Sequence, residues 1–132
     1  MTMLIAKTYG AKYQGYVPIC EAMNDRDITD YDILTLRELP LYFIYSLDDG
    51  TVNPQQCEQP TILRLVEAGA VDLHVSTSEH VIDMSGRWHD PWGNPYQYNG
   101  HWSWIYFFND ETKCDTCEKT TFEWLSEHIP EQ

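Results

Sequence analysis

The run Leu41–Leu47, with the sequence LYFIYSL, constrains the fold of this chain more than any other segment. It is rich in aromatic and branched residues, which favour a β-strand. Asp48-Asp49-Gly50 follows directly and is typical of a turn. Pro40 precedes the run, and because the residue before a proline avoids the helical conformation, any helix upstream should end there. The sequence therefore predicts a strand at residues 41–47, with a helix before it.

Three segments show the signals of short helices, at residues 30–39, 61–68 and 120–128. The first places apolar side chains three and four positions apart, as on one helix face. Thr29 precedes this segment and Asp32 follows three positions later, which is the spacing of a capping box. A glycine follows the second segment and suits a helix C-terminus. These signals predict two or three short helices.

Residues 70–76 alternate between apolar and polar side chains, as expected for a half-buried strand. Residues 86–101 contain three glycines and two prolines, so little regular structure is expected there. The length fits one domain. We expect a single compact α+β domain over residues 1–132, built mainly around an antiparallel sheet. Further strands are predicted at residues 3–9, 12–20, 80–84 and 102–108.

The charge balance is strongly acidic, with 8 Lys+Arg against 21 Asp+Glu and a formal net charge of −13. This excludes non-specific binding to nucleic acid, which requires cations that displace counterions from phosphates. The charge is uneven, since residues 21–58 carry a net −7 and residues 109–132 a net −5. Such a field steers a basic partner and speeds association.

In an extended segment, Asp25 and Asp27 would lie about 6.6–6.8 Å apart on one side, of the order of the phosphate spacing in a nucleic acid. In size and charge, the chain resembles small acidic proteins that imitate DNA, such as anti-restriction and anti-CRISPR proteins. The resemblance implies that carboxylates bind a basic protein. An ordinary acidic surface that keeps the protein in solution is the alternative. The candidate partner-binding carboxylates are Asp25, Asp27, Asp30, Asp32, Asp48 and Asp49.

Residues 88–108 hold nine of the 18 aromatic side chains, and Asp90 is their only formal charge. Aromatic side chains with few charges are typical of interface centres. The loop can present Trp88, Trp92 and Tyr96 to a partner, or it can fold back on the domain. We expect the following strand, residues 102–108, to build the core.

Cys114 and Cys117 form a C-x-x-C pair, which can hold a zinc ion or act as a redox dithiol. The acidic residues around the pair raise thiol pKa values and disfavour a reactive thiolate. Two unreactive thiols in a turn are the third possibility. Zinc requires further ligands, and the candidates are Cys20, Cys57, His101 and His128.

Catalytic signals are weaker. His74 and Asp72 alternate on a predicted strand and so face the same side, and Ser76 or Ser78 could complete a Ser-His-Asp set. No nucleophile elbow accompanies them. No stretch approaches the ~18 apolar residues of a membrane span, and the apolar run at residues 3–6 is too short for a signal peptide. A cytoplasmic location is therefore expected.

Together, these features predict a small acidic inhibitor or antidote that binds a basic, nucleic-acid-handling protein, with no enzyme activity and no direct binding to nucleic acid or membrane. A nuclease-immunity protein is a close variant of this hypothesis. The alternative is a zinc or thiol protein centred on Cys114 and Cys117. No cofactor other than zinc is expected, and the sequence does not indicate an oligomeric state.

Overall fold

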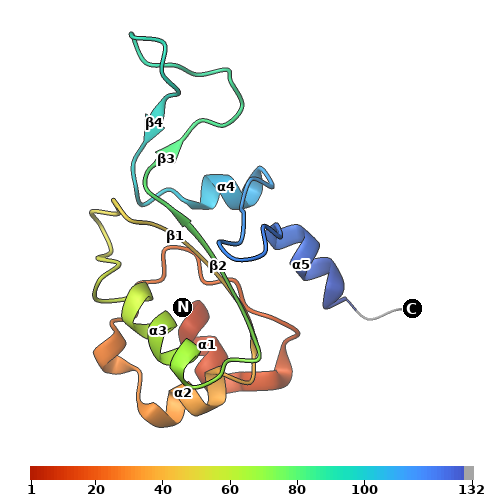
Figure 1. Cartoon of the computed structure of the whole chain (residues 1–132). Coiled ribbons are helices and arrows are strands. Elements are labelled where there is room, and N and C mark those ends of the chain that lie inside the picture. Colours follow the sequence, from red (N-terminus) through yellow and green to blue (C-terminus); the bar gives the residue numbers. More distant parts are fainter. Residues whose placement is uncertain (130–132) are drawn as a thin grey trace.

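The computed structural model describes residues 1–129; the last three residues of the chain lie outside the described part. Its centre is β1 (Pro40–Ser46), which pairs in parallel with β2 (Asp72–Ser78). On the other side of β1, the segment 16–19 runs parallel to it through two isolated bridges. Three chain segments thus lie side by side in one direction, and β1 is in the middle (Figure 1).

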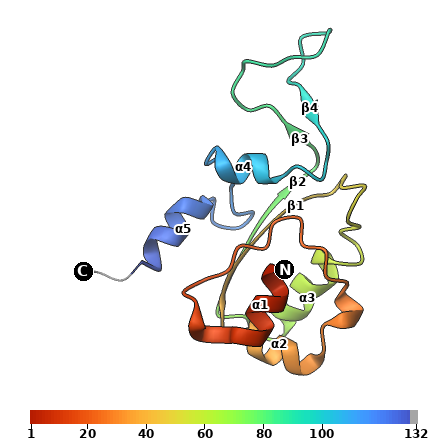
Figure 2. The ribbon, with the colours of Figure 1, turned by 180° about the vertical axis from the view of Figure 1, so that it is seen from behind.

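Three helices pack against one face of this sheet: α1 (Thr2–Tyr9), α2 (Asp30–Leu36) and α3 (Glu58–Glu67). Figure 2 shows them gathered on one side of the strands. Helix α3 connects β1 to β2, and the three elements form a parallel βαβ unit. Two short 3₁₀ helices, Gly10–Lys12 and Asp25–Asp27, precede α2. The core on this face contains Met3, Ala6, Ile33, Leu36, Leu41, Phe43 and Leu65.

The opposite face of β1 packs against the C-terminal part of the chain. There α4 (Trp104–Phe108) and α5 (Thr121–Glu127) follow the arm described next. Tyr42 and Ile44 contact a second buried cluster that contains Cys114 and Trp124. Since alternate residues of β1 are buried on opposite faces, this strand is covered on both sides, as is typical of parallel sheets.

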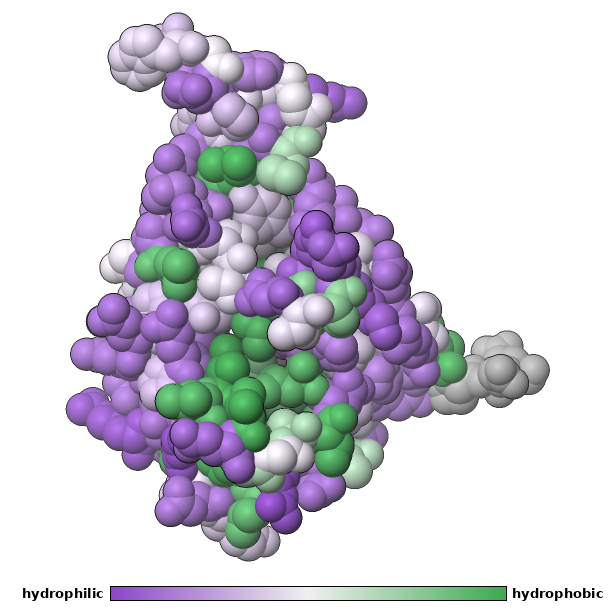
Figure 3. Space-filling model, in the orientation of Figure 1, coloured by the Kyte–Doolittle hydropathy of each residue, from purple (hydrophilic) through white to green (hydrophobic). Residues whose placement is uncertain are grey.

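A two-stranded arm, residues 81–98, projects from the rest of the molecule (Figure 1). It consists of β3 (Val81–Ile82), which pairs antiparallel with β4 (Gln97–Tyr98), and the loop between them. Much of the surface seen in Figure 3 is polar, and its apolar side chains gather over α3 and β2. None of the helices in residues 1–129 is long and apolar enough to cross a membrane.

Several predictions from the sequence are confirmed. The protein is a single compact α+β domain, with strands close to residues 41–47 and 70–76. The three predicted helices are α2, α3 and α5, and the Thr29–Asp32 capping box is present with both of its hydrogen bonds. The predicted arrangement of the sheet is wrong, since the larger pair of strands is parallel. The described part contains five α-helices rather than two or three.

The strands predicted at residues 3–9 and 102–108 are helices α1 and α4. Both segments are short apolar runs, which periodicity alone does not assign to a strand or a helix. In α1 the buried residues Met3 and Ala6 are three positions apart, which is the helical spacing. The expectation that residues 102–108 build the core is also wrong in part, because Trp102 and Phe108 are exposed. Residues 12–20 form bridges to β1 but no continuous strand.

Candidate metal centre

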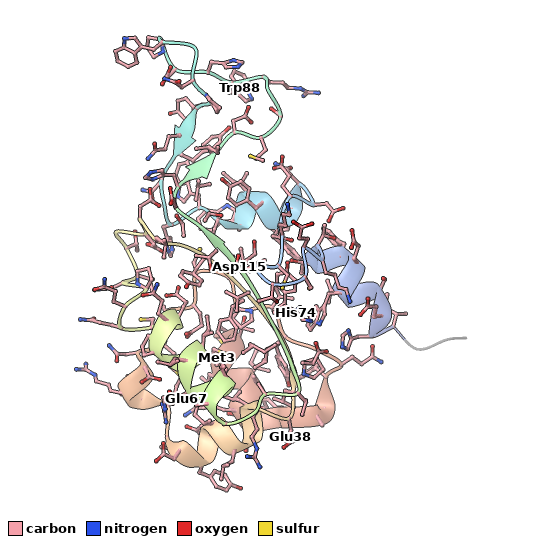
Figure 4. The ribbon with its side chains drawn as sticks, in the orientation of Figure 1. Met3, Glu38, Glu67, His74, Trp88 and Asp115 are labelled. Carbon is pink, nitrogen blue, oxygen red and sulfur yellow. The ribbon has the colours of Figure 1, made fainter. Side chains whose placement is uncertain are left out.

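Strand β2 directs Asp72 and His74 to the face that α5 covers. Figure 4 shows His74 on β2, on the side towards α5. One carboxylate oxygen of Asp72 accepts hydrogen bonds from His74 Nε2 at 2.9 Å and from Trp124 Nε1 at 3.1 Å. The other accepts from His128 Nε2 at 2.7 Å. Because a carboxylate only accepts, His74 donates to it from Nε2, and in the neutral imidazole Nδ1 then keeps a lone pair that can bind a metal ion. The prediction that Asp72 and His74 face the same side is confirmed.

The C-x-x-C turn lies beside this lone pair. The Asp115 N–H donates to the carbonyl of Val75 in β2 at 2.8 Å, so the turn is attached to the free edge of the strand. The Glu118 N–H donates to the Cys114 carbonyl at 2.9 Å, and Glu118 has a positive φ of 63°, which closes the turn tightly. The turn places the Sγ atoms of Cys114 and Cys117 at 3.3 and 3.5 Å from His74 Nδ1.

These three donor atoms all lie within 4.8 Å of one another. In a tetrahedral zinc site, bond lengths of about 2.3 Å to sulfur and 2.0–2.1 Å to nitrogen require N···S separations of about 3.5 Å. The two observed N···S distances are close to that value. Both N···S separations therefore match two edges of a zinc tetrahedron, and the two sulfur atoms lie within 4.8 Å of each other. In this arrangement Asp72 orients the imidazole from behind, as carboxylates commonly do for metal-bound histidines.

The two thiols have different proton affinities. Burial raises the pKa of Cys114, but hydrogen bonds from the Thr116 side chain and from the Thr116 and Cys117 N–H groups, together with the contact to His74, outweigh it and lower this pKa to about 6. The Lys119 N–H lowers the pKa of Cys117, yet partial burial and the neighbouring Cys114 raise it above the ordinary value. Cys114 is thus the first of the pair to ionise. The expectation that acidic neighbours would raise its pKa is wrong, because local donors dominate.

His74 is the ligand that the sequence did not indicate, since it was considered only as a catalytic base. The four residues proposed to complete a zinc site are not close to the pair. Cys20 and His101 belong to a separate cluster with Asp49. Cys57 donates to the Ala22 carbonyl, and His128 contacts Asp72 instead. Ser76 and Ser78 form no hydrogen bond to His74; Ser76 Oγ accepts from the Lys113 N–H.

Five of the six predicted carboxylates have a basic side chain as partner, and for three of them this is Arg64 or Lys7. Arg64 bridges Asp25 and Asp30 at 2.9 and 2.8 Å, and Lys7 contacts Asp32 at 3.2 Å. His80 and His101 bond to Asp48 and Asp49, respectively. Asp27 is exposed and has no side-chain partner among residues 1–129. These pairs reduce the local field that the sequence predicted for this segment.

The aromatic side chains of the arm point to solvent. Trp88, Trp92 and Tyr96 are exposed, at 63 %, 83 % and 47 % of their surface. Asp83 and Asp90 accept backbone N–H groups inside the loop, so the arm has its own hydrogen-bonded turns. Trp88, Tyr96 and Tyr98 also line a small open pocket with His89. The loop therefore does not fold back on the domain.

No protein-family model and no curated protein matches this sequence. Among solved structures, one described as a thermostable esterase is similar, with a TM-score of 0.66 and 17 % sequence identity. The match covers 96 % of this chain but only 27 % of the esterase chain. At this identity, the likeness concerns the fold alone.

Proposed function

We propose that this protein binds one zinc ion through Cys114, Cys117 and His74. The observation that carries the proposal is the convergence of these three donors from two distant segments, at the spacing of a tetrahedral site. Two thiolates and one imidazole are a typical zinc donor set. A water molecule or a partner side chain would complete the coordination.

The proposed ion would add a connection between two parts of the chain. His74 belongs to the central sheet, whereas Cys114 and Cys117 lie between α4 and α5. Three hydrogen bonds already attach the turn to β2: from Asp115 to Val75, from Thr77 to Asp115 and from Lys113 to Ser76. A shared metal ion would fix the turn on β2, and zinc binding at such a site is coupled to folding. The proposed role of the ion is therefore structural.

Two other uses of the same residues fit the geometry less well. Cys114, His74 and Asp72 are arranged as a nucleophile, a base and an orienting acid. However, Cys114 is only 2 % exposed, which restricts the access of a substrate to its sulfur. In a redox pair, the accessible thiol Cys117 would have to attack, but its pKa is raised, which disfavours the thiolate. A metal ion uses both thiols without needing access for a large reactant.

The test is metal content and cobalt spectroscopy of the full chain. Reconstitution with Co²⁺ should give a thiolate-to-cobalt charge-transfer band, and Cys114→Ser or His74→Ala should abolish or shift it. Cys57→Ser is the matched control, because Cys57 is also buried but lies outside this cluster. Purified protein with a Cys114–Cys117 disulfide and no Co²⁺ band would refute the zinc proposal and favour the redox alternative.

We infer a second function, as an acidic inhibitor or antidote that binds a basic, nucleic-acid-handling protein. The exposure of Trp88, Trp92 and Tyr96 on a projecting arm favours it, since aromatic anchors of this kind dominate binding energies. The formal net charge of −13 would guide a basic partner to the arm. Partner capture from cell extract, at low and high salt, tests it when wild type is compared with Trp92→Ala. Capture that is insensitive to both salt and the substitution would refute it.

A further inference from the structure

A second group of donors lies at the carboxyl edge of the parallel segments. Cys20 follows segment 16–19, and Asp49 follows β1, so both stand where neighbouring parallel strands end. This edge is the usual position of ligand sites in parallel sheets. His101 reaches the same place from the segment between the arm and α4. The donor atoms of Cys20, Asp49 and His101 lie within 4.8 Å of one another.

The surroundings hold these three side chains firmly. The Asp49 side chain is fully buried, and one of its oxygens accepts the N–H groups of Thr51 and Val52 at 2.9 Å. Its other oxygen contacts His101 Nδ1 at 2.8 Å. Cys20 Sγ lies 2.9 Å from both the Ser103 hydroxyl and the His101 carbonyl. One oxygen of Asp49 is thus used by the backbone, and the second faces the cluster.

Glu58 provides the independent observation. It is the first residue of α3, its side chain has no exposed surface, and neither carboxylate oxygen has a hydrogen-bond partner. A buried carboxylate without a partner costs several kcal/mol unless a cation or a proton compensates it. Asp49 and Glu21 are close enough to act electrostatically on Glu58, and Glu58 acts on Cys20. Glu21 is also buried and has one carboxylate oxygen without a partner.

No Lys or Arg forms a salt bridge with Glu21, Asp49 or Glu58 within residues 1–129. We propose that Cys20, Asp49 and His101 bind a divalent zinc ion, at a site separate from Cys114, Cys117 and His74. Sulfur, imidazole and carboxylate donors together favour zinc over calcium or magnesium, which prefer oxygen donors alone.

In this site the ion replaces the hydrogen bond between His101 and Asp49 with a bond to each. The charge of the ion also offsets that of buried Glu58, which no Lys or Arg compensates within residues 1–129. One thiol proton is released on binding, so affinity should rise with pH.

The experiment measures zinc per protein in the full chain after growth with zinc and removal of free metal. Wild type should hold about two equivalents, and His101→Gln and Cys114→Ser/Cys117→Ser should each hold about one. Combining the three substitutions should leave none. His80→Gln is the matched control and should keep two, because His80 also contacts an aspartate after β1 but lies outside both donor clusters.

Because the two sites are emptied by different substitutions, their failures are distinguishable. His101→Gln with unchanged zinc content overturns the second site, whatever happens to the first; His101 is only partly buried, so the substitution should be tolerated. If His101→Gln does not fold, Cys20→Ser replaces it, because serine keeps the size of the side chain and removes the thiol. A wild type with one equivalent that is lost entirely in Cys114→Ser/Cys117→Ser also overturns the second site, and Glu58 is then held protonated.

Discussion

Asp72 connects the proposed zinc centre to the fold, and replacing it with Asn tests both. Its carboxylate accepts hydrogen bonds from His74, Trp124 and His128, which come from β2 and α5. Asn has one acceptor oxygen and no charge. Asn can therefore accept the hydrogen bonds at only one of the two oxygen positions of Asp72. At the other position its NH₂ group would face a hydrogen-bond donor. The pKa of Asp72 is lowered in spite of partial burial, because Trp124 and both histidines favour the carboxylate.

Two magnitudes follow for Asp72→Asn. Loss of a carboxylate behind a metal-bound histidine typically lowers affinity by about 10–100-fold, which is about 1.4–2.7 kcal/mol. In metal-free protein, hydrogen bonds to a charged group contribute about 1.5–3 kcal/mol each. Since the Asp72 side chain is 27 % exposed, we take the lower end and expect a loss of about 2 kcal/mol in the free energy of unfolding.

Zinc affinity is measured by competition with a chromophoric chelator, and stability by urea unfolding in the presence of EDTA. Asp27→Asn is the matched control, because it removes one exposed carboxylate without a side-chain partner in the described part of the chain. We expect the control to change neither quantity by more than about 0.5 kcal/mol. If Asp72→Asn binds zinc within threefold of wild type, Asp72 does not position His74 for a metal, and the centre has been misassigned.

Three further predictions concern other parts of the molecule. Trp92→Ala should change the free energy of unfolding by no more than about 0.5 kcal/mol, because the side chain is exposed; a loss of several kcal/mol in thermal unfolding would return the arm to the core. Burial raises the pKa of Asp32, but the hydrogen bonds from Thr29 and Lys7 lower this pKa by more. The Asp32 carboxylate therefore stabilises the fold above about pH 4, and this stabilisation disappears as pH falls through the lowered pKa. Asp32→Asn should therefore cost about 0.5–1 kcal/mol at pH 7 and nothing at the acid end of a pH series of urea unfolding; an equal cost at both ends would contradict this. Chelation should lower the melting temperature of wild type, while Cys114→Ser/Cys117→Ser should respond less, and equal shifts would show that EDTA acts elsewhere.

The sequence predicted the elements whose signals are local. The β1 run, the Thr29–Asp32 capping box and the glycine after α3 each depend on residues near in the chain, and each is present. The parallel sheet could also have been inferred. The run LYFIYS is apolar without alternation, which is typical of a strand buried on both faces. Helices α1 and α4 could not be distinguished from strands, because only tertiary contacts decide between these conformations for short apolar runs.

For the candidate metal centre too, the sequence predicted only what depends on residues close together in the chain. The C-x-x-C spacing identified Cys114 and Cys117, and the alternation of Asp72 and His74 placed those two on one side of a strand. Their meeting depends on the turn that lies against the edge of β2, through the contact from Asp115 to Val75. Nothing in the sequence indicates which strand edge this turn will contact. A ligand set assembled across 40 residues of chain therefore appears only in the structure.

Binding of the two proposed ions would change the formal net charge of the protein very little, so the surface would stay acidic. An ion held by Cys114, Cys117 and His74 adds two positive charges while two thiols lose their protons, so the formal charge does not change. At the second site, one thiol proton is lost, and the net gain is a single positive charge. The formal net charge of −13 is therefore nearly preserved with both ions bound. Zinc at these sites would stabilise the attachment of residues 99–129 to the sheet and leave the acidic field that would guide the proposed basic partner towards Trp88 and Trp92.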